Sequence, residues 1–239
     1  MIVKFIKSIP FLYSLALGIK HQWWNIQTKK KFKSYVSSID LPKLQLGAGL
    51  NKLDGWFNTD YFARPAICFL DVTKKFVFPD GTFEYAFSEH HIEHISYHHA
   101  QFMLNETFRV MKSGGYLKVN TPDLHQYISS YANRALQTPI IKKHVIDWIY
   151  SGFAKASTYV PVTEHYEAHF MNDLFLNYEH RFIYDEQALK TLLEKAGFVK
   201  VINLNVANPC IPALQNIESH LTDFDSMFTL SMQAQKPLN

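Results

Sequence analysis

Short apolar runs, each followed by a turn or an acidic residue, recur along this 239-residue chain. The runs are hydrophobic throughout rather than alternating, which is typical of parallel strands that are buried on both faces. This pattern predicts seven strands, at Leu44–Leu46, Trp56–Asn58, Ile67–Leu70, Tyr85–Phe87, Tyr116–Val119, Val199–Leu204 and Met227–Gln235.

Two segments between these strands have the spacing of helices. Apolar residues recur at helical intervals from about Ser96 to Met111, and the pair Gly114-Gly115 is expected to end that helix. Asp185 has the position of an N-cap for a later helix that ends at Gly197. Strands that alternate with helices indicate an α/β fold with a doubly wound, mostly parallel sheet.

The chain also divides into a short N-terminal part and a main domain. Residues 1–42 are predicted to form a helical segment, and residues 43–239 the main domain with an insertion at about 138–180 after the fifth strand. A loop this long usually has a function or helices of its own. Its aromatic and histidine residues include Trp148, Tyr150, Tyr159, His165, Tyr166, His169, Phe170, Phe175, Tyr178 and His180.

The first 33 residues admit two interpretations. An apolar core at Ile9–Ile19 resembles part of a signal peptide, but it is too short to span a bilayer and contains Pro10. Trp23, Trp24 and the lysines between positions 29 and 33 suit a membrane surface. The segment is therefore expected either to pack on the sheet as a helix or to touch the inner membrane peripherally.

Bulk composition restricts the class of protein. With 47% apolar and 19% charged residues the chain is not globally disordered. A net charge of +3 argues neither for nor against nucleic acid, which is not expected as a partner. Cys68 and Cys210 lie far apart and suggest neither a disulfide framework nor a zinc site, so the chain is expected to be cytoplasmic.

The most informative feature is a Gly-x-Gly turn, Gly47-Ala48-Gly49, directly after the first predicted strand. Asp60 and Asp71 follow the second and third strands, and the carboxyl ends of parallel strands meet at one edge of a sheet. Glycine allows a ligand to approach the backbone closely, and carboxylates accept hydrogen bonds from hydroxyl and amino groups. The pattern predicts a nucleoside site.

A dinucleotide is a poor fit to this pattern. The third glycine of the G-x-G-x-x-G motif is replaced by Lys52, and Asp60 follows Gly49 by eleven residues, where about twenty are usual. A full helix does not fit between the first two strands, so a pyrophosphate would lose the helix N-terminus that binds it. The nucleoside is therefore expected to carry no phosphates.

In their order along the chain, eight motifs resemble those of the S-adenosylmethionine-dependent methyltransferases with a Rossmann-like sheet, most closely a small bacterial branch associated with glycan biosynthesis. Each motif is weak alone, and their succession over some 150 residues makes the resemblance specific. Ser113 departs from it, because the family more often has proline there. The motifs are Leu44–Gly49, Gly55–Asp60, Leu70–Val72, Phe78–Ser88, Ile92–His94, Val110–Leu117, His180–Tyr184 and Ala196–Phe198.

The resemblance implies S-adenosyl-L-methionine as cofactor, a seven-stranded sheet with an antiparallel last strand, and a shortened first crossover. Asp60 would hold the ribose hydroxyls and Asp71 would face the adenine amino group, although Asp71 could instead be a turn carboxylate at a strand end. Asp60, Asp71 and Glu89 would also suit a sulfonium cation. The cofactor-binding residues expected are Leu46, Gly47, Ala48, Gly49, Asp60, Tyr61, Asp71, Val72, Ser88 and Glu89.

A run of histidines follows the fourth strand and invites a metal interpretation. His90 and His94 would share one helix face and Glu93 could add a carboxylate, but the order differs from the H-E-x-x-H motif of zinc hydrolases. The resemblance also implies no metal here. We therefore expect no functional metal, and we expect His98 and His99 to be solvated.

The acceptor is expected beyond the fourth strand. Methyl transfer is an in-line displacement, so alignment of donor and acceptor dominates, and a base helps when the acceptor is a hydroxyl. His90, Asp123 and His180 are the candidate bases, with Asp123 equally suited to cap a helix and His180-Arg181 to bind an anion or orient the insertion. The resemblance implies that the acceptor is a sugar or glycan precursor. One alternative is a methyltransferase that acts on another small molecule. The other is a catalytically silent protein that binds the cofactor and serves as a partner.

Overall fold

The structure is a computed structural model that describes residues 10–133, 139–144, 166–176, 178–205, 210–219 and 222–238. Most of the predicted insertion, including Trp148, Tyr150, Tyr159 and His165, lies outside the described residues.

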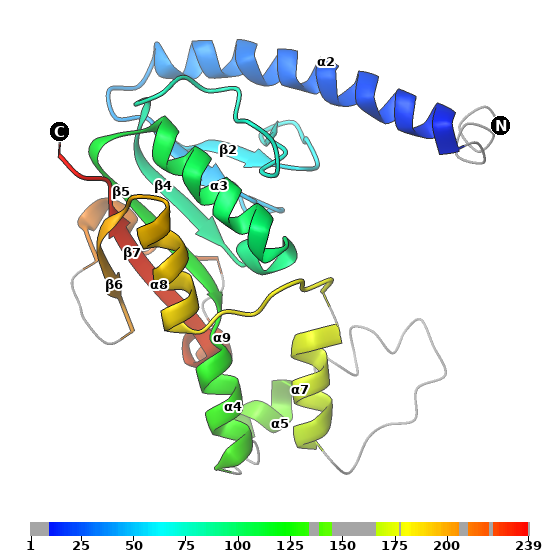
Figure 1. Cartoon of the computed structure of the whole chain (residues 1–239), viewed down its shortest axis with the longest axis vertical. Coiled ribbons are helices and arrows are strands. Elements are labelled where there is room, and N and C mark those ends of the chain that lie inside the picture. Colours follow the sequence, from blue (N-terminus) through cyan, green and yellow to red (C-terminus); the bar gives the residue numbers. More distant parts are fainter. Residues whose placement is uncertain are drawn as a thin grey trace.

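One seven-stranded sheet forms the centre of the molecule, with the strand order β3-β2-β1-β4-β5-β7-β6 (Figure 1). The first five strands run parallel to one another, while β7 is antiparallel to both β5 and β6. The strands are β1 (Lys43–Leu46), β2 (Phe57–Asp60), β3 (Cys68–Phe69), β4 (Phe83–Glu89), β5 (Met111–Pro122), β6 (Val199–Asn203) and β7 (Thr229–Gln235).

This sheet confirms the predicted α/β class, the antiparallel last strand and the short first crossover. Residues 47–56, between β1 and β2, contain turns and no helix. Several predicted boundaries are wrong; the fifth strand, for example, is longer than predicted, and it contains Gly114 and Gly115. The helix expected to reach Met111 ends at Val110, because Met111 already pairs with Phe83. Met227 belongs to a short helix, α9 (Asp223–Phe228), rather than to the last strand.

Helices α3 (Tyr97–Val110) and α8 (Glu186–Lys195) lie side by side on one face of the sheet (Figure 1). The Asp185 side chain caps α8 by accepting a hydrogen bond from the Ala188 N–H at 2.7 Å, as predicted. After α8, Gly197 adopts a φ of +102°, and a Cβ there would lie 2.9 Å from the Phe108 ring. Glycine thus serves both the turn and the packing of α8 on α3.

The opposite face is covered by an irregular segment rather than a helix pair. Residues 210–219 contain a single turn, η5 (Pro212–Leu214), and Leu214 packs with Trp56 and Phe87. Lys118 on β5 is almost completely buried and forms an ion pair with Glu218 of this segment. This segment therefore contributes Leu214 to the core.

The N-terminal helix α2 (Pro10–Val36) runs along the β3 edge of the sheet, and its first turns extend beyond the sheet (Figure 1). Its last turns are anchored by Phe32, which packs against Phe57, Phe78 and Phe83, and by Thr28, whose hydroxyl donates to the Phe69 carbonyl. This agrees with a helix packed on the sheet. Among the described residues, no helix has both the length and the apolar character needed to cross a membrane.

A third group of helices lies beyond the end of β5. Helices α4 (Leu124–Ala132), α5 (Pro139–His144) and α7 (Tyr166–Leu176) gather there with α9 (Figure 1). Their own apolar cluster is centred on Tyr127, Phe170 and Phe228. Among the described parts of the predicted insertion, residues 139–144 and 166–176 are thus helical.

Candidate functional site

The Gly-x-Gly turn lies where three strands end together. β1 pairs with β2 on one side and with β4 on the other, so Leu46 lies beside Thr59 and Ser88. The Ala48 N–H donates to the Thr59 carbonyl at 2.9 Å and holds the turn against β2. Leu46 and Ala48 are buried. The predicted cofactor residues at the ends of β1 and β2 therefore lie next to one another in space.

The two glycines of this turn have different surroundings. Both adopt positive φ, +67° at Gly47 and +55° at Gly49. A Cβ at Gly47 would lie 2.2 Å from Cγ of His91, whereas a Cβ at Gly49 would have no atom of the described residues, apart from its neighbours in the chain, within 4 Å. Gly47 is thus required by a neighbouring side chain of the protein itself. Only Gly49 leaves open space next to the backbone, as a bound ligand requires.

Asp60 closes the turn. Its Oδ2 accepts the Gly49 N–H at 2.9 Å and its Oδ1 accepts the Phe62 N–H at 2.8 Å. The Arg64 guanidinium donates to the Gly49 carbonyl at 2.6 Å and lies 3.8 Å from the Asp60 carboxylate. A carboxylate has about four acceptor positions, so these contacts leave capacity for further donors. Arg64 was not predicted, and its place in the sequence gave no signal.

Asp71 follows β3 in an Asx turn. Its Oδ1 accepts hydrogen bonds from the Thr73 N–H at 3.0 Å and the Thr73 hydroxyl at 2.6 Å. This is the turn role that the sequence left open for Asp71, and the Oδ2 atom is not needed for it. Val72 is buried, and Tyr61 is 42% exposed with its ring 5.4 Å from that of His21 on α2.

The end of β4 is linked to the Gly-x-Gly turn by residue 219. Both carboxylate oxygens of Glu89 accept the Ser219 N–H, and the Ser219 hydroxyl donates to Glu89 at 2.6 Å. The Asn51 amide donates to the same hydroxyl at 2.7 Å. Ser88 is buried, and its hydroxyl has no hydrogen-bond partner among the described residues. Sequence reasoning missed Ser219, which is 130 residues from Glu89.

Beyond β4, histidine side chains lie around the buried carboxylate of Glu93. Glu93 is completely buried in the turn η1 (Ile92–His94), and its Oε2 accepts the Thr121 hydroxyl at 3.1 Å. Its Oε1 lies 3.3 Å from Nδ1 of His90, whose φ of +43° is unusual for a residue with a side chain. His90 Nε2 lies 3.2 Å from the Thr229 hydroxyl. Both ring nitrogens of His90 therefore have polar neighbours.

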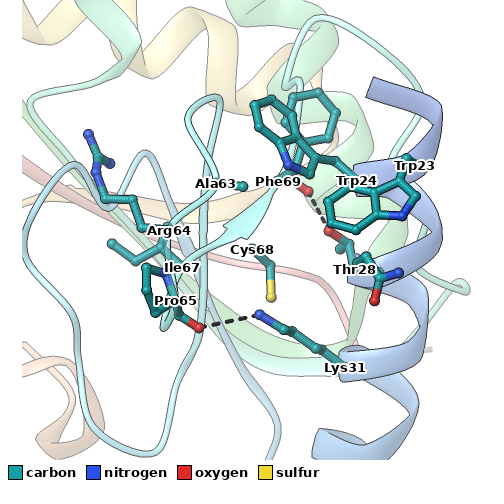
Figure 2. Close-up of a pocket in the computed structure, with 11 residues that line it drawn as sticks. Trp23, Trp24, Thr28, Lys31, Ala63, Arg64, Pro65, Ile67, Cys68 and Phe69 are labelled. Carbon is teal, nitrogen blue, oxygen red and sulfur yellow. Dashed lines mark hydrogen bonds between the residues drawn. The ribbon is translucent and has the colours of Figure 1, made fainter. Parts of the chain in front are cut away.

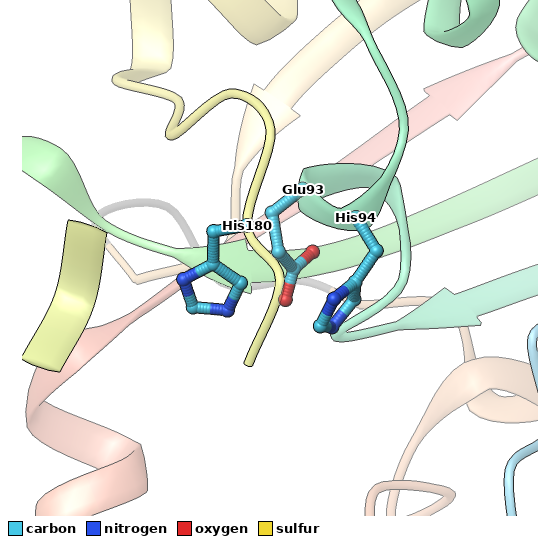
Figure 3. Close-up of side chains that lie close together, drawn as sticks. All are labelled: Glu93, His94 and His180. Carbon is cyan, nitrogen blue, oxygen red and sulfur yellow. The ribbon is translucent and has the colours of Figure 1, made fainter. Parts of the chain in front are cut away.

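His94 and His180 complete the group, which we call the Glu93 cluster (Glu93, His94 and His180). The two imidazole centroids are 5.0 Å apart, and Figure 3 shows the Glu93 carboxylate between the rings. His180 reaches the cluster because the Glu93 carbonyl accepts the N–H groups of Arg181 and Phe182. Burial lowers the pKa of His180. Burial alone would raise the pKa of Glu93, but contacts with the histidines outweigh it and leave that pKa lowered.

Asp123, the third candidate base, caps a helix. Its Oδ1 accepts the N–H groups of His125 and Gln126 at 2.9 and 3.4 Å, at the start of α4. Burial raises the pKa of this carboxyl. Of the two roles left open by the sequence, the structure gives Asp123 the cap, and it does not bring Asp123 into the Glu93 cluster.

A separate cavity of about 380 Å³ lies between α2 and β3 (Figure 2). Trp23, Trp24 and Thr28 line it from the helix, and Lys31 donates to the Pro65 carbonyl across its base. Arg64 borders the cavity, and its guanidinium contacts Gly49. None of the predicted cofactor residues lines it, so we do not assign this cavity to the nucleoside site.

The sequence matches no family model and no curated protein. Among solved structures, the chain is similar to an S-adenosylmethionine-dependent methyltransferase from Archaeoglobus fulgidus, with a TM-score of 0.46 and 14% identity over 90% of this chain and 94% of that one. It is also similar to one from Thermotoga maritima, with a TM-score of 0.45 and 14% identity over 92% and 97% of the two chains.

A further likeness is to the S-adenosylmethionine-dependent methyltransferase SibL, with a TM-score of 0.46 and 12% identity. That match covers 97% of this chain and 61% of SibL. At such identities and TM-scores a likeness does not indicate an activity, so the function has to be inferred from the residues of the site.

Proposed function

We propose that this chain is an S-adenosylmethionine-dependent methyltransferase. The observation that carries the proposal is the convergence of Gly49, Asp60 and Asp71 at the carboxyl ends of three adjacent parallel strands, next to open space at Gly49. A nucleoside presents hydroxyl and amino donors to two such carboxylates, and the short first crossover offers no helix N-terminus for phosphates. When bound, the cofactor supplies a methyl group on a sulfonium sulfur.

The residues at the turn fit this cofactor. Asp60 would accept the ribose hydroxyls with its remaining acceptor positions, and Asp71 would accept the adenine amino group with its Oδ2. Ser88 supplies a hydroxyl that lacks a partner among the described residues. Three carboxylates, at Asp60, Asp71 and Glu89, favour a cationic ligand at this edge.

Calorimetric titration with S-adenosylmethionine tests the proposal. A charged hydrogen bond contributes roughly 1.5–3 kcal/mol, so Asp60→Ala should weaken binding about tenfold to a hundredfold. Asp54→Ala is the matched control, because Asp54 is an exposed carboxylate near the same turn that pairs only with Lys52 among the described residues. Absence of binding to the native chain, or equal losses in both variants, would contradict the assignment.

We further propose that the acceptor is a hydroxyl of a sugar or glycan precursor. The resemblance to the glycan-associated branch supports this, and so does the position of the half-buried histidines His90 and His180 beyond β4, where the acceptor is expected. The acceptor oxygen would form the new bond to the methyl carbon, the carbon–sulfur pair would pass to sulfur, and the hydroxyl proton would leave. In this proposal His90 or His180 assists the departure of that proton, since Asp123 is used as a cap.

Incubation with labelled methyl donor and fractionated glycan precursors tests the acceptor. Label in a nucleotide-sugar or lipid-sugar fraction is the expected result. Label in another small molecule would favour the second candidate, a methyltransferase of different specificity. Cofactor binding without any labelled product would favour a silent cofactor-binding protein.

We also propose peripheral membrane contact through the outer face of α2. Leu15, Ile19, Trp23 and Ile26 recur at helical spacing, and each is more than half exposed. Lys20, Lys29, Lys30 and Lys33 on the same helix are exposed and would attract anionic lipids.

Vesicle cosedimentation tests this contact. We expect the chain to sediment with anionic vesicles and not with neutral ones, and we expect Trp23→Ser combined with Ile19→Ser to abolish it. If that variant, or a chain lacking residues 1–36, sedimented with anionic vesicles as the native chain does, the proposed membrane contact would be contradicted.

A further inference from the structure

The charge balance around Glu93 is unusual. The side chain is completely buried, and among the described residues no lysine or arginine forms an ion pair with it; its partner at ion-pair distance is His90, at 3.3 Å. Buried carboxylates are rare unless a cation or several donors compensate the lost hydration. Glu93 is thus a buried carboxylate whose ion-pairing neighbour among the described residues is a histidine.

The atoms that face Glu93 are ligand atoms. One potential donor atom from each of Glu93, His94 and His180 lies within 4.8 Å of the other two. In a tetrahedral zinc site with bonds of about 2.0–2.2 Å, ligand atoms are roughly 3.4 Å apart. Side-chain movements of about an ångström would therefore close the cluster around an ion.

The outer contacts of the cluster are those of metal-binding residues. His180 Nδ1 lies 2.6 Å from the Leu174 carbonyl, which fixes that nitrogen as the protonated one and leaves Nε2 with its lone pair. The Thr121 hydroxyl holds one oxygen of Glu93. Ligand histidines commonly donate their second ring nitrogen to a backbone carbonyl, and ligand carboxylates are themselves hydrogen-bonded.

We propose that Glu93, His94 and His180 form a binding site for a divalent transition metal ion of the zinc class. Two imidazoles and one carboxylate are donors that zinc prefers, whereas magnesium and calcium are bound by oxygen. Three protein ligands leave a position open, as in catalytic zinc sites. This proposal departs from the expectation of no metal drawn from the sequence, where His180 could not be placed beside His94.

The role of the ion, unlike its binding, rests on the proposed methyl transfer. The cluster lies past the end of β4, on the side where the acceptor is expected. A zinc-class ion lowers the pKa of a bound hydroxyl group. In that position it would activate the acceptor oxygen, and His180 would act as a ligand rather than as the base.

Metal binding by the tag-free full chain, stripped with a chelator, tests the site. We expect one equivalent of Zn²⁺ with submicromolar affinity in competition with a chromophoric chelator, and a Co²⁺ derivative with visible absorption bands of a four- or five-coordinate site. His94→Ala and His180→Ala should each weaken Zn²⁺ binding at least a hundredfold. The matched control is His98→Ala, because His98 is an exposed histidine outside the cluster and its loss should change nothing.

Circular dichroism identifies a variant that fails to fold, and His180→Gln then replaces it, since glutamine can keep the bond to the Leu174 carbonyl. No stoichiometric Zn²⁺ binding by the native chain, or an equal loss in the His98 control, would overturn the site. S-adenosylmethionine titrations of the stripped chain separate the two proposals: cofactor binding without Zn²⁺ binding contradicts only the metal site, and the reverse contradicts only the methyltransferase assignment.

Discussion

Two regions at the same edge of the sheet are built in opposite ways. The Gly loop (Gly47, Gly49, Asp60 and Asp71) is closed by hydrogen bonds from backbone N–H groups to nearby carboxylates, all within about 30 residues of chain. The Glu93 cluster, with Thr121, depends on side chains from segments up to 87 residues apart. Local chemistry determines the first region, and the tertiary fold determines the second.

The largest effect is expected at Gly47. Alanine there would carry a positive φ, at a cost of about 1–2 kcal/mol, and its Cβ would overlap the His91 ring, where overpacking costs about 1–3 kcal/mol more. We therefore expect Gly47→Ala to reduce the free energy of unfolding by about 2–5 kcal/mol in urea denaturation.

Gly49→Ala provides the matched comparison within the same turn. It carries a similar positive φ, but its Cβ would meet no atom of a non-neighbouring described residue within 4 Å, so only the strain of about 1–2 kcal/mol applies. This variant should remain folded and should lose affinity for S-adenosylmethionine. Equal destabilisation of both variants would show that His91 does not constrain the turn as the structure indicates.

The same contrast explains what could be predicted from the sequence. The succession of strands and helices along the chain could be predicted from short apolar runs, helical spacing and caps, and local signals such as the Asp185 N-cap and Gly197 supported that prediction. Boundaries failed where pairing overrides the local pattern, as at Met111, which pairs with Phe83. Residues 210–219 cover one face of the sheet, but their sequence has no helical or strand periodicity from which this could be predicted.

The residues of the Gly loop could be predicted as site residues from the sequence, because each follows closely after a predicted strand. The contact of Gly47 with His91 could not be predicted, since a glycine does not reveal what lies opposite it. The pairing of His94 with His180 across 86 residues, and of Glu89 with Ser219 across 130, had no local signature. Such contacts require the tertiary structure.

A medium loss of stability is expected when Asp123 is substituted. Asp123 sharpens the comparison because it makes only local contacts, as the cap of α4, although it lies outside the Gly loop. Loss of an N-cap costs about 0.5–2 kcal/mol, so Asp123→Ala should lower the free energy of unfolding by that amount. Asp123→Asn should remain near the native value, because asparagine caps helices equally well. A severe loss of stability in the asparagine variant would contradict the cap.

The pH dependence of these variants follows from burial. Because burial raises the pKa of Asp123, the folded chain keeps this proton to a higher pH than the unfolded chain does. The associated stability is present below the unfolded pKa of about 3.9 and is lost as the pH rises through the folded pKa. The stability difference between the native chain and Asp123→Asn should therefore shift against the native chain over that interval, as urea denaturation at several pH values would show.

The smallest effect is expected at Ser219, which connects the Gly loop to the end of β4. Ser219→Ala removes one hydroxyl that donates to Glu89 and accepts from Asn51, but the Ser219 N–H still donates to Glu89. Since this residue is exposed, we expect a loss of only about 0.5–1 kcal/mol in urea denaturation.

The reason for so small a value is that residues 210–219 are held independently by the buried Lys118–Glu218 ion pair and by Leu214. Glu218→Gln should therefore cost more than Ser219→Ala, because it leaves the Lys118 ammonium buried without its carboxylate. If Ser219→Ala proved the more damaging of the two, the bridge from Asn51 to Glu89 would be holding the segment in place, and the two regions would depend on each other for stability.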